Sequence, residues 1–305
     1  MTSNRNSFLL LLFVFLLAPS AVADDEDFRC MVCGQIVDKG YRIEGKFYCK
    51  PHVEEALPKC YSCGKPIKGQ YMAVSEKRHP VCTDCRENQP RCFLCTMPAA
   101  DLSGGRSLPD GRRVCRDHLE TGVSDPGQAQ QLFRQARSEV IQVLGNRMRL
   151  PKPVKSVKLV GLQELIASSK GSGHSSGLRA GKVLGITNLT YLKRGNESSL
   201  QPSTINLLNY VPAERMLSVA AHEYTHVWHA ENHRDYSTTK SVLREGFAEW
   251  VAYKVAQSYG RTEQMEVMMN PNGGIYYQGL RKFLELERRR GIDGVLDYAV
   301  GATKI

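Results

Sequence analysis

Apolar residues recur every three or four positions in several stretches of the second half of the chain, which is the period of an amphipathic helix. The first stretch covers residues 127–149 and follows Asp125 and Pro126, a pair that favours a helix start. Pro151 and Pro153 are expected to end this helix. Its apolar stripe consists of Leu132, Phe133, Ala136, Val140, Ile141, Leu144 and Met148. The same period predicts further helices at residues 212–228, 243–259 and 277–290.

Shorter apolar stretches, bounded by polar loops, predict strands at residues 154–160, 182–192 and 203–210. A segment rich in serine and glycine at residues 168–177, with a lone His174, is expected to be a loop without a metal. The strand at residues 203–210 runs directly into the helix at residues 212–228. We therefore predict an α+β domain over residues 121–305.

The first 23 residues have the pattern of a cleaved secretory signal. Arg5 gives the positive start, residues 8–18 form an apolar run, and Ala21-Val22-Ala23 fits the small-residue cleavage rule. We expect the mature chain to begin near Asp24 and to be secreted or periplasmic, without a membrane span; an uncleaved anchor is the alternative.

All ten cysteines lie between residues 30 and 115, and together with two histidines they make six Cys-x-x-Cys or Cys-x-x-His pairs. Successive pairs are separated by fifteen to nineteen residues within each unit, and the unit repeats about every thirty residues. This spacing predicts three tetrahedral structural zinc sites in a zinc-binding region at residues 24–120. The expected ligand sets are Cys30, Cys33, Cys49 and His52, then Cys60, Cys63, Cys82 and Cys85, and finally Cys92, Cys95, Cys115 and His118.

An even cysteine count in an exported chain also suggests disulfides. Disulfides do not explain the histidines at two fourth positions, so zinc is the preferred interpretation. In the middle site, His79 lies three residues before Cys82 and is an alternative to Cys85. Cys85 is preferred because it preserves the repeat.

The helix at residues 212–228 contains His222-Glu223-Tyr224-Thr225-His226, an HExxH pattern. Residues four apart share one face of a helix, so His222 and His226 can bind one metal ion. Two imidazoles and a carboxylate suit a catalytic Zn²⁺ with one open position. Glu223 is then placed as the general base for a water activated at that ion.

Eighteen residues separate His226 from Glu245-Gly246-Phe247-Ala248, which opens the next predicted helix. Here the sequence resembles the gluzincins of the aminopeptidase N type, and this resemblance implies Glu245 as the third zinc ligand. Glu249, one turn later, is either a hydrogen-bond partner of a ligand histidine or a surface acid. The metzincin pattern is absent, so His229 and His233 are interpreted as polar residues at a helix end rather than as ligands.

The surroundings of the cysteines, such as Tyr48-Cys49-Lys50-Pro51-His52, resemble LIM-type fingers. Residues 29–260 resemble the plant organ-size regulators of the DA-one type, in which such fingers precede an HExxH peptidase. The resemblance implies a zincin-like metallopeptidase domain after small LIM-like modules. The signal-like N-terminus and the third finger unit at residues 92–118 depart from the family pattern, so the family's substrates and regulation are not carried over.

The expected function is therefore a zinc peptidase with one catalytic and three structural Zn²⁺ ions, acting on a protein or peptide, with fingers that hold the substrate or a protein partner. A tyrosine among Tyr253, Tyr276 and Tyr277 is a candidate donor to the developing oxyanion. The alternative is a zinc-finger adaptor with a silent peptidase core, although no ligand or base is missing. A formal charge of +10 with many acids among the fingers does not favour nucleic-acid binding.

Overall fold

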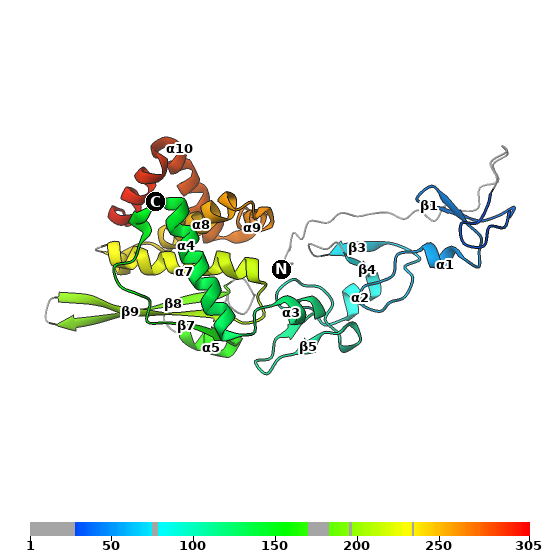
Figure 1. Cartoon of the computed structure of the whole chain (residues 1–305), viewed down its shortest axis with the longest axis horizontal. Helices are drawn as coiled ribbons and strands as arrows, with labels where there is room; N and C mark the ends of the chain where they lie inside the picture. The colour runs from blue at the N-terminus through cyan, green and yellow to red at the C-terminus, as the bar shows by residue number, and fades with distance from the viewer. Residues whose placement is uncertain (1–27, 75–78, 170–182, 195–196, 234) are drawn as a thin grey trace. The chain divides into compact units, whose positions relative to one another are not determined.

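The computed structural model describes residues 28–74, 79–169, 183–194, 197–233 and 235–305 (Figure 1). Contacts divide the chain into two compact units, Met1–Leu119 and Glu120–Ile305. The predicted signal at residues 1–23 and the predicted loop with His174 lie outside the described residues. In the part that the structure describes, no helix is both long and apolar enough to cross a membrane.

The first unit repeats one small module three times, each with a hairpin followed by a helix. In every module the first cysteine pair sits in a turn closed by a backbone hydrogen bond, for example from Gly34 N to Cys30 O at 2.8 Å and from Thr96 N to Cys92 O at 3.0 Å. The hairpins are β1 (Tyr41–Ile43) with β2 (Lys46–Tyr48), β3 (Tyr71–Val74) with β4 (His79–Cys82), and β5 (Arg106–Ser107) with β6 (Arg113–Val114). The helices are α1 (Val53–Ala56), α2 (Thr83–Asn88) and α3 (Arg116–Thr121), and a 3₁₀ turn, η1, covers Asp101–Ser103.

The residue after each of these cysteine pairs has a positive φ, which lets the turn bring two sulfur atoms together. Gly34 and Gly64 have φ values of 70° and 71°. In the third module Thr96 takes the same conformation, with φ 64°. The turn geometry of the third module is therefore that of the other two, although its sequence lacks the glycine.

In the second unit, three strands form a mixed sheet in the order β7-β9-β8. β7 (Ser156–Val160) runs parallel to β9 (Glu197–Leu208), and β8 (Gly185–Arg194) pairs antiparallel with β9. The last two strands are a long hairpin, and the prediction missed residues 197–201 of β9, which were expected in a polar loop but pair with β8.

The predicted helix at residues 127–149 is α4 (Pro126–Leu144). Its start is as predicted, since the side chain of Asp125 accepts a hydrogen bond from Gln128 N at 2.7 Å. The predicted end is wrong: the helix stops at Gly145, whose φ of 88° is not helical. A 3₁₀ turn, η2 (Asn146–Met148), follows and buries Met148, which explains why the apolar stripe continued past the end of the helix.

The other helices are α5 (Leu162–Ser168), α7 (Ala213–Asn232), α8 (Ser241–Ser258), α9 (Thr262–Met268) and α10 (Ile275–Gly301), with 3₁₀ turns η3 (Tyr236–Thr238) and η4 (Pro271–Gly273). The prediction at residues 277–290 found only the first part of α10, because the chain kinks at Gly291 and continues helical. Figure 1 shows α7 between the sheet on one side and α8 with α10 on the other, and α4 crosses it. α7 is therefore the centre of this unit's core.

Candidate metal centres

α7 and α8 bring three metal-binding side chains of the second unit to one point. His222 and His226 lie on one face of α7, with their Nε2 atoms 3.1 Å apart. Oε2 of Glu245, from α8, lies 3.3 Å from the first of these nitrogens and 3.4 Å from the second. All three residues are buried, so this cluster is an organised site in the core.

The shape of this triangle fits one small cation. A tetrahedral zinc site with bonds of about 2.0–2.1 Å has edges of about 3.3–3.4 Å between its ligand atoms. The three distances between the ligand atoms of the cluster lie close to that value. Two imidazoles and one carboxylate are also the donor set of a zinc site with an open fourth position.

The outer nitrogen of each histidine is oriented by a neighbour. Nδ1 of His222 donates to Oε2 of Glu249 at 3.0 Å, and Nδ1 of His226 lies 3.2 Å from the hydroxyl of Tyr236. A histidine that donates through Nδ1 presents a lone pair at Nε2, as a metal ligand must. Glu249 is thus bonded to a ligand histidine, the first of the two roles open from the sequence. Tyr236 could not be found from the sequence because no motif marks it.

Charge in the cluster favours a cation. Burial lowers the pKa of His222, but hydrogen bonds to Glu245 and Glu249 outweigh it and raise the pKa to about 10. Burial acts to raise the pKa of Glu245, yet the two histidines hold it well below its usual range. The site therefore retains positive charge against a buried carboxylate, and a metal ion can supply that charge in place of a proton.

Glu223 lies beside the cluster and is held by β8. Thr187 Oγ1 donates to Oε2 of Glu223 at 2.7 Å and to its backbone carbonyl at 2.9 Å. A Cβ on Gly185 would lie 2.8 Å from Cγ of Glu223, so only glycine leaves room for the carboxylate there. Neither Thr187 nor Gly185 was singled out from the sequence, because their roles depend on β8 lying against α7.

A cavity of about 490 Å³ opens onto the cluster. One wall is β8, an edge strand that pairs only with β9 among the described strands. The strand that leads into the HExxH helix, β9, is instead the central strand of the sheet, and residues of β8 line the cavity. The cavity lining includes Gly185, Thr187, Glu223, Arg244 and Tyr276.

Of the three candidate tyrosines, Tyr276 lines this cavity, and its ring centroid lies 5.8 Å from that of His222. Burial raises the pKa of Tyr276, so its phenol remains a protonated donor. Tyr277 instead accepts a hydrogen bond from Arg281 at 3.3 Å, and neither Tyr277 nor Tyr253 is among the residues that line the cavity.

His229 and His233 do not join the cluster and lie at the end of α7, as predicted: His229 is in its last turn and His233 follows its last residue. Both are buried, with side chains that donate to the carbonyls of Ala299 (2.7 Å) and Ala302 (2.8 Å). Burial lowers the pKa of His229 to about 3. These histidines therefore fasten α7 to the end of α10.

The first unit holds three further clusters, each with four ligand atoms within 4.8 Å of one another. A tetrahedral site with Zn–S bonds of about 2.3 Å has edges of about 3.8 Å between sulfur atoms. The Sγ atoms of Cys95 and Cys115 are 3.7 Å apart, and those of Cys33 and Cys49 are 4.0 Å apart. The clusters contain the twelve cysteines and histidines that the spacing grouped, and all ten cysteines are free of disulfides.

In the middle cluster the fourth residue is Cys85, and His79 lies aside. The His79 ring stacks on Tyr61 with centroids 4.2 Å apart, and its Nε2 is 3.3 Å from Oδ2 of Asp117. Burial raises the pKa of Cys60, but backbone N–H donors from Cys63 and Cys82 outweigh it and lower the pKa to about 7. Such donors favour the thiolate form that binds zinc.

The chain is similar to several known proteins. It is 25% identical over 274 residues to Protein DA1 of Arabidopsis thaliana, covering 79% of this chain and 50% of DA1. It is 25% identical over 256 residues to the LIM domain-containing protein HDR3 of Oryza sativa subsp. japonica, covering 74% of this chain and 50% of HDR3. Zyxin of Mus musculus is 29% identical over 85 residues, which are 27% of this chain and 14% of zyxin. No family model and no solved structure matches the chain.

Three Cys/His clusters in repeated hairpin modules, followed by an α+β unit with a buried His/His/Glu cluster, define a LIM-domain-containing protein with metal-binding sites. The similarity to DA1, a DA1-related protein and HDR3 supports the DA1-like family at family level, as the sequence motifs implied. The chain spans about half the length of the curated plant relatives it matches.

Proposed function

We propose that the second unit is a zincin-like peptidase domain and that the chain hydrolyses peptide bonds with Zn²⁺ held by His222, His226 and Glu245. The observation that carries this proposal is the convergence of these three side chains, with the carboxylate of Glu223 beside them in one cavity. When bound, the ion would acidify a water and polarise the scissile carbonyl. The three other clusters would hold structural Zn²⁺ ions.

The chain's own groups have distinct roles in this mechanism. Glu223 takes the proton of the attacking water and delivers it to the leaving amine. Thr187 fixes the orientation of that carboxylate through its hydrogen bond. The free edge of β8 offers backbone groups that can pair with an extended peptide, and Tyr276 offers its phenol to the carbonyl oxygen.

Three variants test this function together. Glu223→Gln should keep the metal and the fold while peptide cleavage falls by roughly two to four orders of magnitude, because a positioned general base is lost. Glu245→Ala should lose both the metal and the activity. Glu249→Ala should lose about ten- to a hundredfold, because Nδ1 of His222 loses its orienting partner. Metal content and cleavage of a peptide library are measured for each variant beside the unmodified chain.

The competing function is a protein-interaction adaptor, which the LIM-type modules and the likeness to zyxin support. It predicts that the zinc-loaded chain cleaves nothing in a broad panel and that Glu223→Gln binds the same partners. A separate outcome concerns the third ligand. If Glu249→Ala empties the site while Glu245→Ala leaves it filled, the assignment of Glu245 is wrong by one helical turn.

We further propose that the chain is exported, so that it acts outside the cytosol as a secreted or periplasmic protein. The charged start, the apolar run and the Ala-x-Ala site support this proposal. N-terminal sequencing of the protein recovered outside the cytosol should begin near Asp24. Recovery of only full-length chain inside the cell would contradict it.

A further inference from the structure

A second cavity, of about 570 Å³, lies against α7 on the side away from the metal cluster. Tyr224, at the base of this cavity, is two residues from His222 and therefore points about 200° away around the helix. One wall is a face of α4 and the other is the segment at residues 149–157. The lining residues are Gln130, Phe133, Arg134, Arg137 and Ile141 of α4, residues 149–157, and Tyr224.

All the charged residues that line this cavity are cationic. Arg134, Arg137, Arg149, Lys152 and Lys155 line it, and no acidic residue does. Arg149 donates to Oδ1 of Asn146 at 3.4 Å, while the other four form no ion pair with any described residue. The acid of α4, Glu139, is buried and bonded to Arg261 at 2.7 and 2.8 Å. Glu231 lies near Lys152, which opposes the rise that burial causes in the pKa of Glu231, but no ion pair joins the two side chains. Most of the positive charge is therefore available to an anionic ligand.

The base of the cavity is apolar, and the wall at residues 149–157 is fixed in place. The Tyr224 hydroxyl donates to the carbonyl of Met148 at 2.6 Å and accepts from Leu150 N at 3.2 Å, which ties the wall to α7. Pro151 and Pro153 restrict the backbone of the same wall. A ligand therefore meets a preformed groove with an apolar base and a cationic rim, so little ordering is needed on binding.

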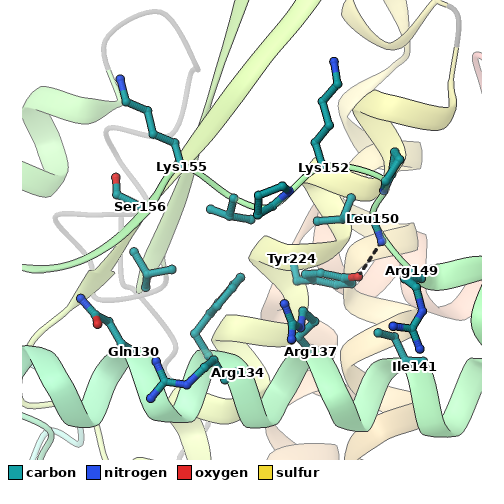
Figure 2. A pocket seen from close by; sticks show the side chains of 15 residues that line it. Gln130, Arg134, Arg137, Ile141, Arg149, Leu150, Lys152, Lys155, Ser156 and Tyr224 are labelled. Carbon is teal, nitrogen blue, oxygen red and sulfur yellow. Dashed lines mark hydrogen bonds between the residues drawn. The ribbon is translucent and has the colours of Figure 1, made fainter.

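The distribution of charge suits an extended ligand. Figure 2 shows Arg134 and Arg137 on α4 at one side of the groove and Lys152 and Lys155 on the opposite segment, standing apart from one another. At about 1.5 Å per helical residue, the distance along α4 from Gln130 to Ile141 is about 16 Å, the length of about five residues of extended chain. A compact ion such as phosphate would contact only some of these cations.

We propose that this groove binds an extended acidic peptide segment of a partner protein, with carboxylates at the cationic rim and an apolar side chain against the half-buried Ile141, Leu150 and Val154 of its lining. This docking site is separate from the metal cluster. It does not depend on whether the chain cleaves peptides.

The test measures binding of a fluorescein-labelled peptide of alternating glutamate and leucine to the full chain by fluorescence anisotropy. All proteins carry Glu223→Gln, so cleavage cannot affect the result. Two charge-reversal pairs probe the two walls: Arg134→Glu with Arg137→Glu, and Lys152→Glu with Lys155→Glu. All four side chains are exposed, and circular dichroism checks that each variant folds. The matched control reverses Arg288 and Arg290, two exposed arginines of α10 outside the groove.

Each groove pair should weaken binding about tenfold or more, since attraction becomes repulsion at two positions, whereas the control pair should change it little. Binding should weaken as salt is added, and a lysine–leucine peptide should not bind. Equal losses in the control pair, or no loss in either groove pair, would overturn the proposal. So would stronger binding of inorganic phosphate, anionic vesicles or single-stranded DNA that is lost in the same variants, because the ligand would then not be a peptide.

Discussion

At the scale of single residues, the proposed base Glu223 depends on a hydroxyl thirty-six positions away in the sequence, that of Thr187. Thr187→Val keeps the size and β-branching of the side chain but removes this donor. A hydrogen bond to a charged group contributes about 1.5–3 kcal/mol, so cleavage should fall roughly tenfold or more while the metal content is unchanged. Thr190→Val, on the exposed part of the same strand, is the matched control. Unchanged turnover in Thr187→Val would show that the carboxylate is positioned without this contact.

The buried imidazole of His229 should make the stability of the second unit depend on pH. Its Nε2 donates to the carbonyl of Ala299, and its buried Nδ1 has no partner among the described residues, so a second proton has no acceptor there. The unfolded ring has a pKa of about 6.5, whereas burial lowers the folded pKa to about 3. The unfolded state therefore binds more protons between these values, and stability is lost as the pH falls through this window.

The change in the free energy of unfolding with pH can be measured by urea unfolding at several pH values between 7 and 4. The comparison is between the unmodified chain and His229→Gln. Glutamine can still donate to Ala299 but does not titrate. Below about pH 6 the unmodified chain should lose about 1 kcal/mol more per pH unit than the variant, close to the limit of 1.36 kcal/mol for one proton. Parallel losses in both proteins would assign the acid sensitivity to other groups.

The residues that could be predicted at this scale are those fixed by local spacing. His222 and His226 share a helix face, and the cysteine pairs share a turn, so their sequence intervals already set their geometry. Thr187, Tyr236 and Gly185 reach the same site from other elements. Their positions depend on tertiary packing, which no interval in the sequence records.

At the scale of elements, α8 and α10 cross where Gly246 meets Gly279. A Cβ on Gly246 would lie 2.4 Å from the Cα of Gly279, so the two backbones touch one residue after Glu245, the proposed third ligand. The Glu-Gly pattern was recognised from the sequence as a motif, and this crossing gives its glycine a physical reason. Without a side chain at either position, α10 can hold α8, and with it Glu245, against α7.

Gly246→Ala should push α8 and α10 apart, because the new Cβ would meet backbone atoms of Gly279, which cannot move without moving the helix. We expect a destabilisation of about 1–3 kcal/mol from overpacking and weaker metal binding as Glu245 shifts. Urea unfolding and competition with a chelator measure the two effects. Gly301→Ala, at the open end of α10 with nothing within 4 Å of its Cβ position, should be close to neutral. Stability and metal affinity that are unchanged in Gly246→Ala would contradict the close crossing.

Elements with a buried apolar stripe were predictable, and those shaped by glycine or by pairing were not. The stripe located α4, but Gly145 ended it five residues before the predicted end. In α10, Gly291 has a φ of 68°, yet the helix resumes beyond it. Residues 197–201 are a strand because they pair with β8, and their mostly polar sequence does not indicate this pairing.

At the scale of the whole molecule, the chain combines two kinds of metal cluster. The three clusters of the first unit each present four ligands, at least three of them thiols, and so fill a tetrahedral ion. The cluster of the second unit presents three ligands and opens onto a cavity. Closed thiolate sites hold zinc as part of the fold, whereas an open site leaves a position for exchange.

Elemental analysis of the full chain should therefore find about four zinc ions, one for each cluster. With mild chelation, the ion of His222, His226 and Glu245 should leave first, so that peptide cleavage is lost while circular dichroism is unchanged. Stronger chelation should then remove the other ions and unfold the first unit, because its small modules have little apolar core without them. One ion per chain, with no free thiols after unfolding, would instead mean that the cysteines form disulfides. Loss of fold and activity at the same chelator concentration would contradict the distinction between open and closed sites.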